Sequence, residues 1–199
     1  MSNVTLGRTG LTVQKNGFGA LPIQRISRDE AARLLQKALD GGMNFFDTAR
    51  AYSDSEEKIG YALADRRDRF VLATKTASKT AEEFWTDLHT SLNNLRTDHV
   101  DLLQFHNPSF CPKPGDGSGL YEAMLQAREE GKIRFISITN HRLAVAREAV
   151  ESGLYDTLQF PFNYLATPEE IALTQLCRER NVGFIAMKAL SGGLITSSA

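Results

Sequence analysis

The sequence is short of the features that mark several large classes of protein. Lysine and arginine nearly balance the acidic residues among its 199 residues, for a net charge of −1. That balance argues against electrostatic binding to nucleic acid or to an anionic membrane, since either needs a basic surface. No apolar run approaches a membrane span, and the first ten residues lack the basic-then-apolar pattern of a secretory signal. We expect no nucleic-acid partner, no membrane partner and a cytoplasmic location.

Cysteine is also scarce, because Cys111 and Cys177 are the only two and lie far apart in the sequence. Two isolated thiols are typical of a reduced cytoplasmic protein, whereas disulfide frameworks and metal sites use defined spacings. We expect two reduced thiols, with a disulfide or a metal pair as the alternative.

What the sequence does contain is a regular alternation of short apolar runs and amphipathic segments. The runs are continuous rather than alternating in polarity, as is typical of strands buried on both faces. They predict seven strands, at 17–21, 43–47, 70–75, 100–106, 133–139, 156–162 and 182–188.

The segments between the runs have helical signals. Ser27 with Glu30, and Thr80 with Glu83, match the capping box at a helix start, and Pro168 fits the first position of another helix. The predicted helices lie at 27–42, 55–67, 80–92, 120–132, 142–153 and 167–181.

Strand followed by helix, repeated along the chain, predicts parallel βα units. Successive strands begin about 27 residues apart, and so regular a period favours a (β/α) barrel over an open doubly wound sheet. The Gly-x-Gly-x-x-Gly fingerprint is missing after the first strand, which also argues against a Rossmann fold. Residues 1–16 read as a hairpin that turns at residues 8–10 and plugs the bottom of the barrel.

The number of strands does not fit a closed barrel. Such a barrel needs eight strands, and the sequence stops just after the seventh. We therefore expect one domain, residues 1–199, folded as an incomplete (β/α)8 barrel that lacks the eighth strand and the last helices. A truncated chain, a fragment, or an assembly whose partner covers the gap would explain it. Unpaired strand edges favour association, so we expect an oligomer through these edges.

Ionisable residues follow the predicted strands where barrel enzymes place their chemistry. Asp47 ends the second strand and Tyr52 follows it, Lys75 ends the third and His106 ends the fourth. A nearby ammonium lowers the pKa of a tyrosine, whose reference value is about 10. Asp47 would orient the ammonium of Lys75, and His106 would bind a substrate oxygen. This set suits protonation of an oxygen as hydride reaches its carbon.

Each of these residues also has a plainer interpretation. Asp47 and Lys75 could form a structural ion pair, Tyr52 could be a packing residue, and His106 could cap a strand. His141 is interpreted as a helix-start residue. A metal site of Asp47, His106 and His141 is conceivable in a barrel, although no short-range ligand pair supports it. Complementary residues at consecutive strand ends favour the catalytic interpretation.

Seven motifs stand in an order and spacing that resemble the aldo-keto reductase family. They are LGRTGLTV, FFDTARAY, ATKT, DLLQFHNP, GKIRFISITNH, QFPFNYL and AMKALSGGL. The resemblance implies a (β/α)8 barrel that reduces an aldehyde or ketone with NADPH, or sometimes NADH. It also implies a catalytic tetrad in which Tyr52 is the general acid, Lys75 lowers its pKa, Asp47 pairs with Lys75 and His106 orients the carbonyl.

The same resemblance implies contacts to the cofactor. Family members hold the nicotinamide carboxamide with a Ser/Thr-Asn pair after the fifth strand and a glutamine on the sixth, and many stack a ring on the nicotinamide at the seventh. The implied cofactor-binding residues are Gly19, Ala20, Asp47, Thr139, Asn140, Gln159, Met187 at the stacking position, and Lys188.

Two departures from the family pattern matter: the thioether of Met187 replaces the stacking aromatic ring, and the eighth strand is missing. The basic motif for the adenosine 2′-phosphate follows the eighth strand, so the preference between NADPH and NADH is not set by these residues. Members of the bacterial and archaeal branch often continue into a cysteine-rich segment, so an iron–sulfur cluster is expected only if such a segment exists. A non-catalytic cofactor-sensing or assembly module is the alternative to a reductase, and a metal-assisted hydrolase is the third hypothesis.

Overall fold

The computed structural model describes residues 2–189, which form a curved sheet of seven parallel strands. Each strand pairs with the next one along the chain, as expected of successive βα units. The strands are β3 (Phe18–Gly19), β4 (Phe45–Asp47), β5 (Val71–Thr76), β6 (Val100–His106), β7 (Ile133–Thr139), β8 (Thr157–Pro161) and β9 (Gly183–Met187).

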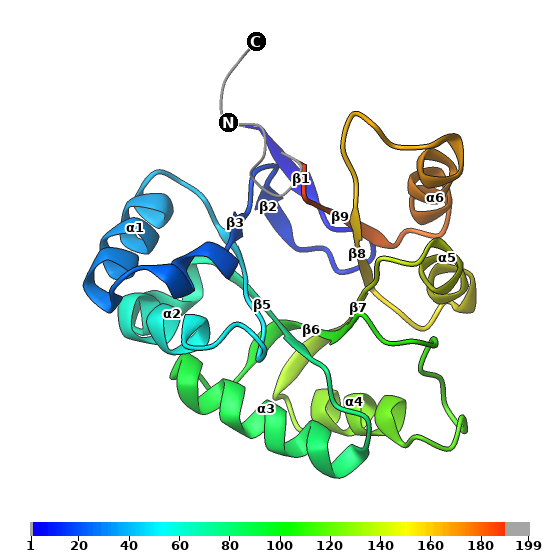
Figure 1. Cartoon of the computed structure of the whole chain (residues 1–199), viewed down its shortest axis with the longest axis horizontal. Helices are drawn as coiled ribbons and strands as arrows, with labels where there is room; N and C mark the ends of the chain where they lie inside the picture. The colour runs from blue at the N-terminus through cyan, green and yellow to red at the C-terminus, as the bar shows by residue number, and fades with distance from the viewer. Residues whose placement is uncertain (1, 190–199) are drawn as a thin grey trace.

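Helices cover the outside of the sheet in an arc, with a gap between β3 and β9 (Figure 1). The α-helices are α1 (Arg28–Asp40), α2 (Ser55–Leu63), α3 (Ala81–Leu95), α4 (Leu120–Glu129), α5 (Leu143–Ser152) and α6 (Pro168–Glu179). Within residues 2–189, β3 and β9 each have one neighbouring strand. The predicted incomplete barrel is confirmed. The end of the AMKALSGGL motif lies outside the described residues.

The helix starts follow the sequence signals closely. Ser27 and Thr167 form complete capping boxes with Glu30 and Glu170. The box expected at Thr80 is only half formed, because the carboxylate of its glutamate accepts from the backbone of the preceding Lys79 instead.

Two short 3-10 helices were not predicted. The first strand is shorter than expected, and η1 (Leu21–Arg25) begins where the strand was predicted to end, with Pro22 in its first turn. The second, η2 (Ala64–Arg69), continues α2 after a break in the regular helical backbone. The first arises where Pro22, which has no backbone N–H, cannot continue a strand ladder.

The N-terminal hairpin packs against the bottom of the barrel. Strands β1 (Asn3–Thr5) and β2 (Thr12–Gln14) pair antiparallel, and Leu6, Leu11 and Val13 are buried in a cluster with the first residues of the barrel strands. Arg8 fixes the hairpin by donating to the carbonyl oxygens of Arg180 at 2.7 Å and Gly153 at 3.2 Å.

Two composition-based expectations bear on this fold. Cys111 and Cys177 are both buried, free thiols, which confirms that they form no disulfide with each other. None of the helices found between residues 2 and 189 is long and apolar enough to cross a bilayer.

Candidate active site

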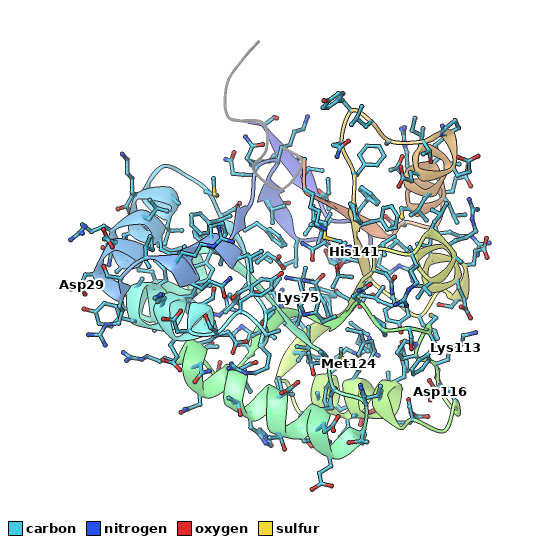
Figure 2. The ribbon with its side chains drawn as sticks, in the orientation of Figure 1. Asp29, Lys75, Lys113, Asp116, Met124 and His141 are labelled. Carbon is cyan, nitrogen blue, oxygen red and sulfur yellow. The ribbon has the colours of Figure 1, made fainter. Side chains whose placement is uncertain are left out.

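The predicted catalytic residues come together at the C-terminal ends of three adjacent strands. β4 pairs with β5, and β5 pairs with β6, so Asp47, Lys75 and His106 converge on one mouth. Lys75 lies near the middle of the ring of elements in Figure 2. Asp47 and Lys75 are buried, whereas Tyr52 and His106 are half-buried.

Asp47 and Lys75 form a buried ion pair. The Nζ atom of Lys75 donates to Oδ2 of Asp47 at 2.7 Å and to the carbonyl oxygen of Thr48 at 2.6 Å. Burial lowers the pKa of Lys75, and the charge and hydrogen bond of Asp47 oppose that effect. The ammonium is thus placed by two acceptors from the end of β4.

Tyr52 lies on a loop that is fixed at both ends. The hydroxyl groups of Thr48 and Ser55 lie 2.9 Å apart, and Ser55 begins α2. The buried Glu56, which follows Tyr52 in the sequence, pairs with Arg50, which precedes it. Glu56 also accepts a hydrogen bond from Thr74 of β5 at 2.7 Å. These contacts join the loop to the strand that carries Lys75.

The aromatic ring of Tyr52 contacts both remaining members of the set. Nζ of Lys75 lies 5.1 Å from the ring centroid, and the rings of Tyr52 and His106 meet edge to face with centroids 5.8 Å apart. Phenol, ammonium and imidazole therefore gather at one mouth of the barrel, where a proton donor and its neighbours could act on one substrate oxygen.

One electrostatic expectation is wrong. We expected Lys75 to lower the pKa of Tyr52, but burial raises the pKa of Tyr52 to about 12, with a further contribution from the charge of Asp47. The physical reason is that desolvation of the phenolate dominates and the negative charge of Asp47 adds to it. Burial, followed by the charge of Lys75, lowers the pKa of His106 to about 4. Tyr52 is protonated and His106 neutral near pH 7.

Backbone strain is concentrated at the same mouth. Five non-glycine residues have positive φ in the described chain, a conformation that is uncommon for residues with a Cβ. Ser53 (38°) follows Tyr52, Asn107 (54°) follows His106, and Lys188 (58°) follows β9. Such strain often collects where a fold places functional side chains.

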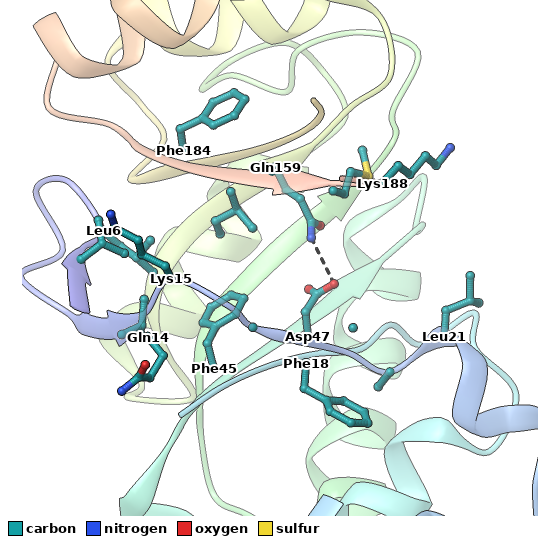
Figure 3. Close-up of a pocket in the computed structure, with 18 of the residues that line it drawn as sticks. Leu6, Gln14, Lys15, Phe18, Leu21, Phe45, Asp47, Gln159, Phe184 and Lys188 are labelled. Carbon is teal, nitrogen blue, oxygen red and sulfur yellow. Dashed lines mark hydrogen bonds between the residues drawn. The ribbon is translucent and has the colours of Figure 1, made fainter. Parts of the chain in front are cut away.

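A cavity of about 520 Å³ adjoins this set, in the gap between β3 and β9 (Figure 3). The hairpin residues Leu6 and Gln14 lie toward one end of it, and Leu21 and Lys188 toward the other. Six of the eight predicted cofactor-binding residues line it, together with Tyr52: Gly19, Ala20, Asp47, Gln159, Met187 and Lys188.

The cavity carries two features that fit a nicotinamide cofactor. Nε2 of Gln159 donates to Oδ2 of Asp47 at 3.1 Å, and Oε1 of the same side chain is buried without a partner. That oxygen can accept from the amide group of a ligand. A Cβ atom added to Gly19 would meet nothing within 4 Å, so the backbone of β3 is open to a ligand there.

The remaining two predicted cofactor residues do not line this cavity. Thr139 and Asn140 are buried at the end of β7, where Thr139 pairs in register with Gln159. The side-chain amide of Asn140 donates to the carbonyl oxygen of Pro108 at 2.9 Å and accepts from the backbone of Arg142 at 2.8 Å. Their contact with a cofactor stays a prediction.

Sequence reasoning missed Gln104, which is fully buried on β6 and donates to Oδ1 of Asp47 at 2.9 Å. A signal for it existed, because Gln104 precedes His106 by two residues and therefore lies on the same face of the strand. It also missed the pocket-lining residues Leu21 and Pro22, which belong to the unpredicted η1.

The described residues contain no group of three or more histidine, cysteine or acidic side chains arranged to hold a metal ion. His141, the third ligand of the metal alternative, lies exposed after β7 with its backbone nitrogen 3.2 Å from Oδ1 of Asn107.

Comparison with known sequences identifies relatives along nearly the whole chain. The model of the aldo/keto reductase family matches residues 14–199. L-galactose dehydrogenase from Arabidopsis thaliana is 30% identical, covering 96% of this chain and 66% of that protein. The aldo-keto reductase YhdN from Bacillus subtilis is 26% identical, covering 98% of this chain and 64% of that protein. The chain thus spans about two thirds of the length of these curated relatives.

Solved structures give the same result. The holo form of an aldo-keto reductase from Bacillus halodurans has a TM-score of 0.88 and 25% identity, covering all of this chain and 70% of that one. An aldo/keto reductase from Klebsiella pneumoniae, in complex with NADP and acetate, has a TM-score of 0.82 and 24% identity, covering 98% and 71%, and supports the fold alone. With its parallel half-barrel, its strand-end tetrad and these matches, the chain belongs to the aldo/keto reductase family.

Proposed function

We propose that the protein reduces the carbonyl group of an aldehyde or ketone to an alcohol, with NADPH as the hydride donor. The observation that carries this proposal is the convergence of four groups: a phenol and a neutral imidazole in edge-to-face contact, beside a buried ammonium–carboxylate pair. In this group Tyr52 is the proton donor and the other three residues support it. A cavity large enough for a ligand adjoins them.

NADPH, when bound, supplies the hydride that reaches the carbonyl carbon. Tyr52 is the general acid, because its raised pKa keeps the hydroxyl protonated at neutral pH. As the carbon–oxygen double bond becomes a single bond, the O–H bond of Tyr52 breaks and an O–H bond forms on the substrate. The ammonium of Lys75, over the ring of Tyr52, offsets the negative charge left on the phenolate.

His106 has a different part in the proposed reaction. Since its pKa is lowered to about 4, its ring is neutral and keeps one N–H to donate. That N–H would hold the carbonyl oxygen beside Tyr52 without adding a competing positive charge. Asp47 positions Lys75 through their 2.7 Å hydrogen bond.

The residues beside the tetrad would hold the cofactor. The unpartnered Oε1 of Gln159 would accept from the nicotinamide carboxamide, and Gly19 and Ala20 would let the backbone approach it. Met187 would contact the ring through its thioether, and Lys188 would contribute positive charge to the phosphates. Thr139 and Asn140 remain proposed carboxamide contacts.

A fluorescence titration with NADPH, and then with NADH, tests the cofactor half of the proposal. We expect micromolar binding that weakens about tenfold in Gln159→Leu, because one hydrogen bond is lost and Asp47 loses a donor. Gln175→Leu, on the exposed surface of α6, is the matched control. If neither cofactor binds, or both variants bind equally well, this half fails.

A panel of aldehydes, ketones and quinones then tests turnover. The open edges of β3 and β9 beside the cavity favour a second candidate function, a cofactor-sensing or assembly module without catalysis. Steady-state oxidation of NADPH with any carbonyl would reject that candidate. Binding of NADPH without turnover on the whole panel would favour it. Since both thiols are buried and unpaired, we propose the cytoplasm as the compartment.

A further inference from the structure

Gln104 has no part in the proposed reaction, yet it contacts one of the four tetrad residues. Its side chain is fully buried, and Nε2 donates to Oδ1 of Asp47 at 2.9 Å. Gln104 and His106 are two residues apart on β6, so their side chains point to the same face of the strand. The amide therefore lies directly beneath the candidate site.

The other oxygen of Asp47 is held separately. Oδ2 accepts from Nζ of Lys75 at 2.7 Å and from Nε2 of Gln159 at 3.1 Å. Three donors from three different strands thus share the two oxygens of one carboxylate. Rotation of the carboxylate about its Cβ–Cγ bond would break at least one of these hydrogen bonds.

This arrangement lowers the stability of the fold. A carboxylate repels an amide oxygen, so both glutamines must turn their NH2 groups toward Asp47 and their oxygens away. Among the described residues, three buried side-chain polar atoms lack a partner, and two of them are Oε1 of Gln104 and Oε1 of Gln159. An unpaired buried acceptor is destabilising. A ligand in the cavity can satisfy Gln159, which lines it, but Gln104 does not line it.

We propose that Gln104 is a positioning residue that locks the carboxylate of Asp47. It holds Oδ1, so that Oδ2 stays on Lys75 and the ammonium stays beside Tyr52. Gln104 touches none of the reacting atoms. This inference rests on the proposed reductase function, in which Asp47 orients Lys75.

The sheet offers a matched control in the same layer of side chains. Gln104 lies between Lys75 and Ser137 in the strand register, and Ser137 is in turn opposite Thr157. Thr157 is also fully buried and donates to the hydroxyl of Ser137 at 2.8 Å. Thr157→Val removes a buried polar group of the same layer without touching Asp47.

Steady-state kinetics of Gln104→Met and Thr157→Val test the catalytic consequence. In Gln104→Met we expect kcat to fall about tenfold to a hundredfold, the rate equivalent of one hydrogen bond to a charged group. KM and the Kd for NADPH should stay close to those of the original chain, and Thr157→Val should keep its kcat. A purely structural role would lower the melting temperature and leave kcat per folded molecule unchanged.

A second measurement does not depend on turnover. In a ¹⁵N-labelled chain, Gln104→Met identifies the side-chain NH2 resonances of Gln104 by their loss. We expect these protons to exchange slowly and to move upfield in Asp47→Asn, because a neutral amide oxygen is a weaker acceptor than a carboxylate.

The two measurements separate the ways in which the inference can fail. NH2 resonances that do not respond to Asp47→Asn would overturn it, as would a Gln104→Met enzyme with unchanged kcat. A chain that binds NADPH but reduces no carbonyl would contradict the proposed function, and the NH2 resonances would still decide whether Gln104 holds Asp47.

Discussion

The interior strands and the edge strands of the sheet carry different parts of the candidate site. β4, β5 and β6 each have neighbours on both sides and bear Asp47, Lys75 and His106. β3 and β9 each have one neighbouring strand among the described residues, and both line the cavity where we place the cofactor. The proposed catalytic groups therefore lie within the paired part of the sheet, and the proposed cofactor site lies along the margin that is unpaired among the described residues.

The interior and the margin also differ in how fully their polar groups are hydrogen-bonded. In the interior, the carboxylate of Asp47 accepts three hydrogen bonds and Lys75 makes two. At the margin, β9 leaves Ala186 exposed, and Gln159 on the adjoining strand β8 lines the cavity with an unpartnered oxygen. The interior geometry is fixed by contacts within the chain, whereas the margin keeps an acceptor and two strand edges without partners among the described residues. Chemistry and cofactor affinity should thus respond separately to mutation.

The largest expected effect comes from Tyr52→Phe, which removes the proton donor and little else. We expect kcat for a carbonyl substrate to fall about a hundredfold to ten-thousandfold, the usual contribution of a general acid. The Kd for NADPH, measured by fluorescence titration, should be unchanged because the hydroxyl is not among its proposed contacts. Unchanged kcat would remove Tyr52 from the mechanism, and a large loss of NADPH binding would break the separation of the two regions.

Lys75→Met should produce the largest change in stability. It leaves Asp47 buried without its charged partner, and breaking such a pair costs about 3–5 kcal/mol in free energy of unfolding. The control is Lys113→Met, because Lys113 and Glu148 form an exposed ion pair, and exposed pairs contribute little to stability. Urea denaturation of both variants checks this. Equal losses of unfolding free energy would mean that the interior pair contributes no more to stability than a surface pair.

A smaller effect is expected for Ala186→Lys, on the open edge of β9. Unpaired edges favour association, and a lysine on such an edge opposes it. We expect the original chain to associate at high concentration and Ala186→Lys to shift the dissociation constant upward about tenfold, or roughly 1.4 kcal/mol. Sedimentation velocity over a concentration series measures this shift. Gln175→Lys adds the same charge to the surface of α6, and an equal shift there would mean that the edge is not the contact.

Most of the fold was predictable because each element carries its own local signal. The continuous apolar runs identified all seven strands of the parallel sheet, and the boxes at Ser27 and Thr167 marked helix starts correctly. The errors occurred where local signals conflict. Pro22 ended the first strand early and opened η1, which an apolar run such as GFGAL could not reveal.

The candidate site was predictable only in part. Residue type and position at strand ends were enough to bring Asp47, Lys75 and His106 together, because parallel strands end at one edge of a sheet. The direction of the pKa shift at Tyr52 was not predictable, since it depends on how deeply the ring is buried and on the charge of Asp47 beside it. Gln104 was missed because a glutamine in a buried strand has no motif of its own.

A last expected effect is a pH dependence of stability due to His106. Its pKa is about 4 in the folded protein, lowered by burial and then by the charge of Lys75, against about 6.5 in an unfolded chain. Between these values the unfolded state binds more protons, so this contribution to stability is present above about pH 6.5 and is lost as the pH falls toward 4. Melting temperatures from pH 7.5 to 4.5, compared with those of His106→Gln, measure it.

The melting temperature of each protein at pH 7.5 serves as its own reference. At that pH, His106 of the original chain is neutral in both the folded and the unfolded state. We expect the melting temperature of the original chain to fall more steeply on acidification than that of His106→Gln. The difference should shrink when both carry Lys75→Met, since the second cause of the shift is then removed. Suppose that the curves of melting temperature against pH are parallel for the original chain and His106→Gln, both with Lys75 intact. Burial and Lys75 would then not hold His106 neutral, and the proposed electrostatic link between β5 and β6 would be wrong.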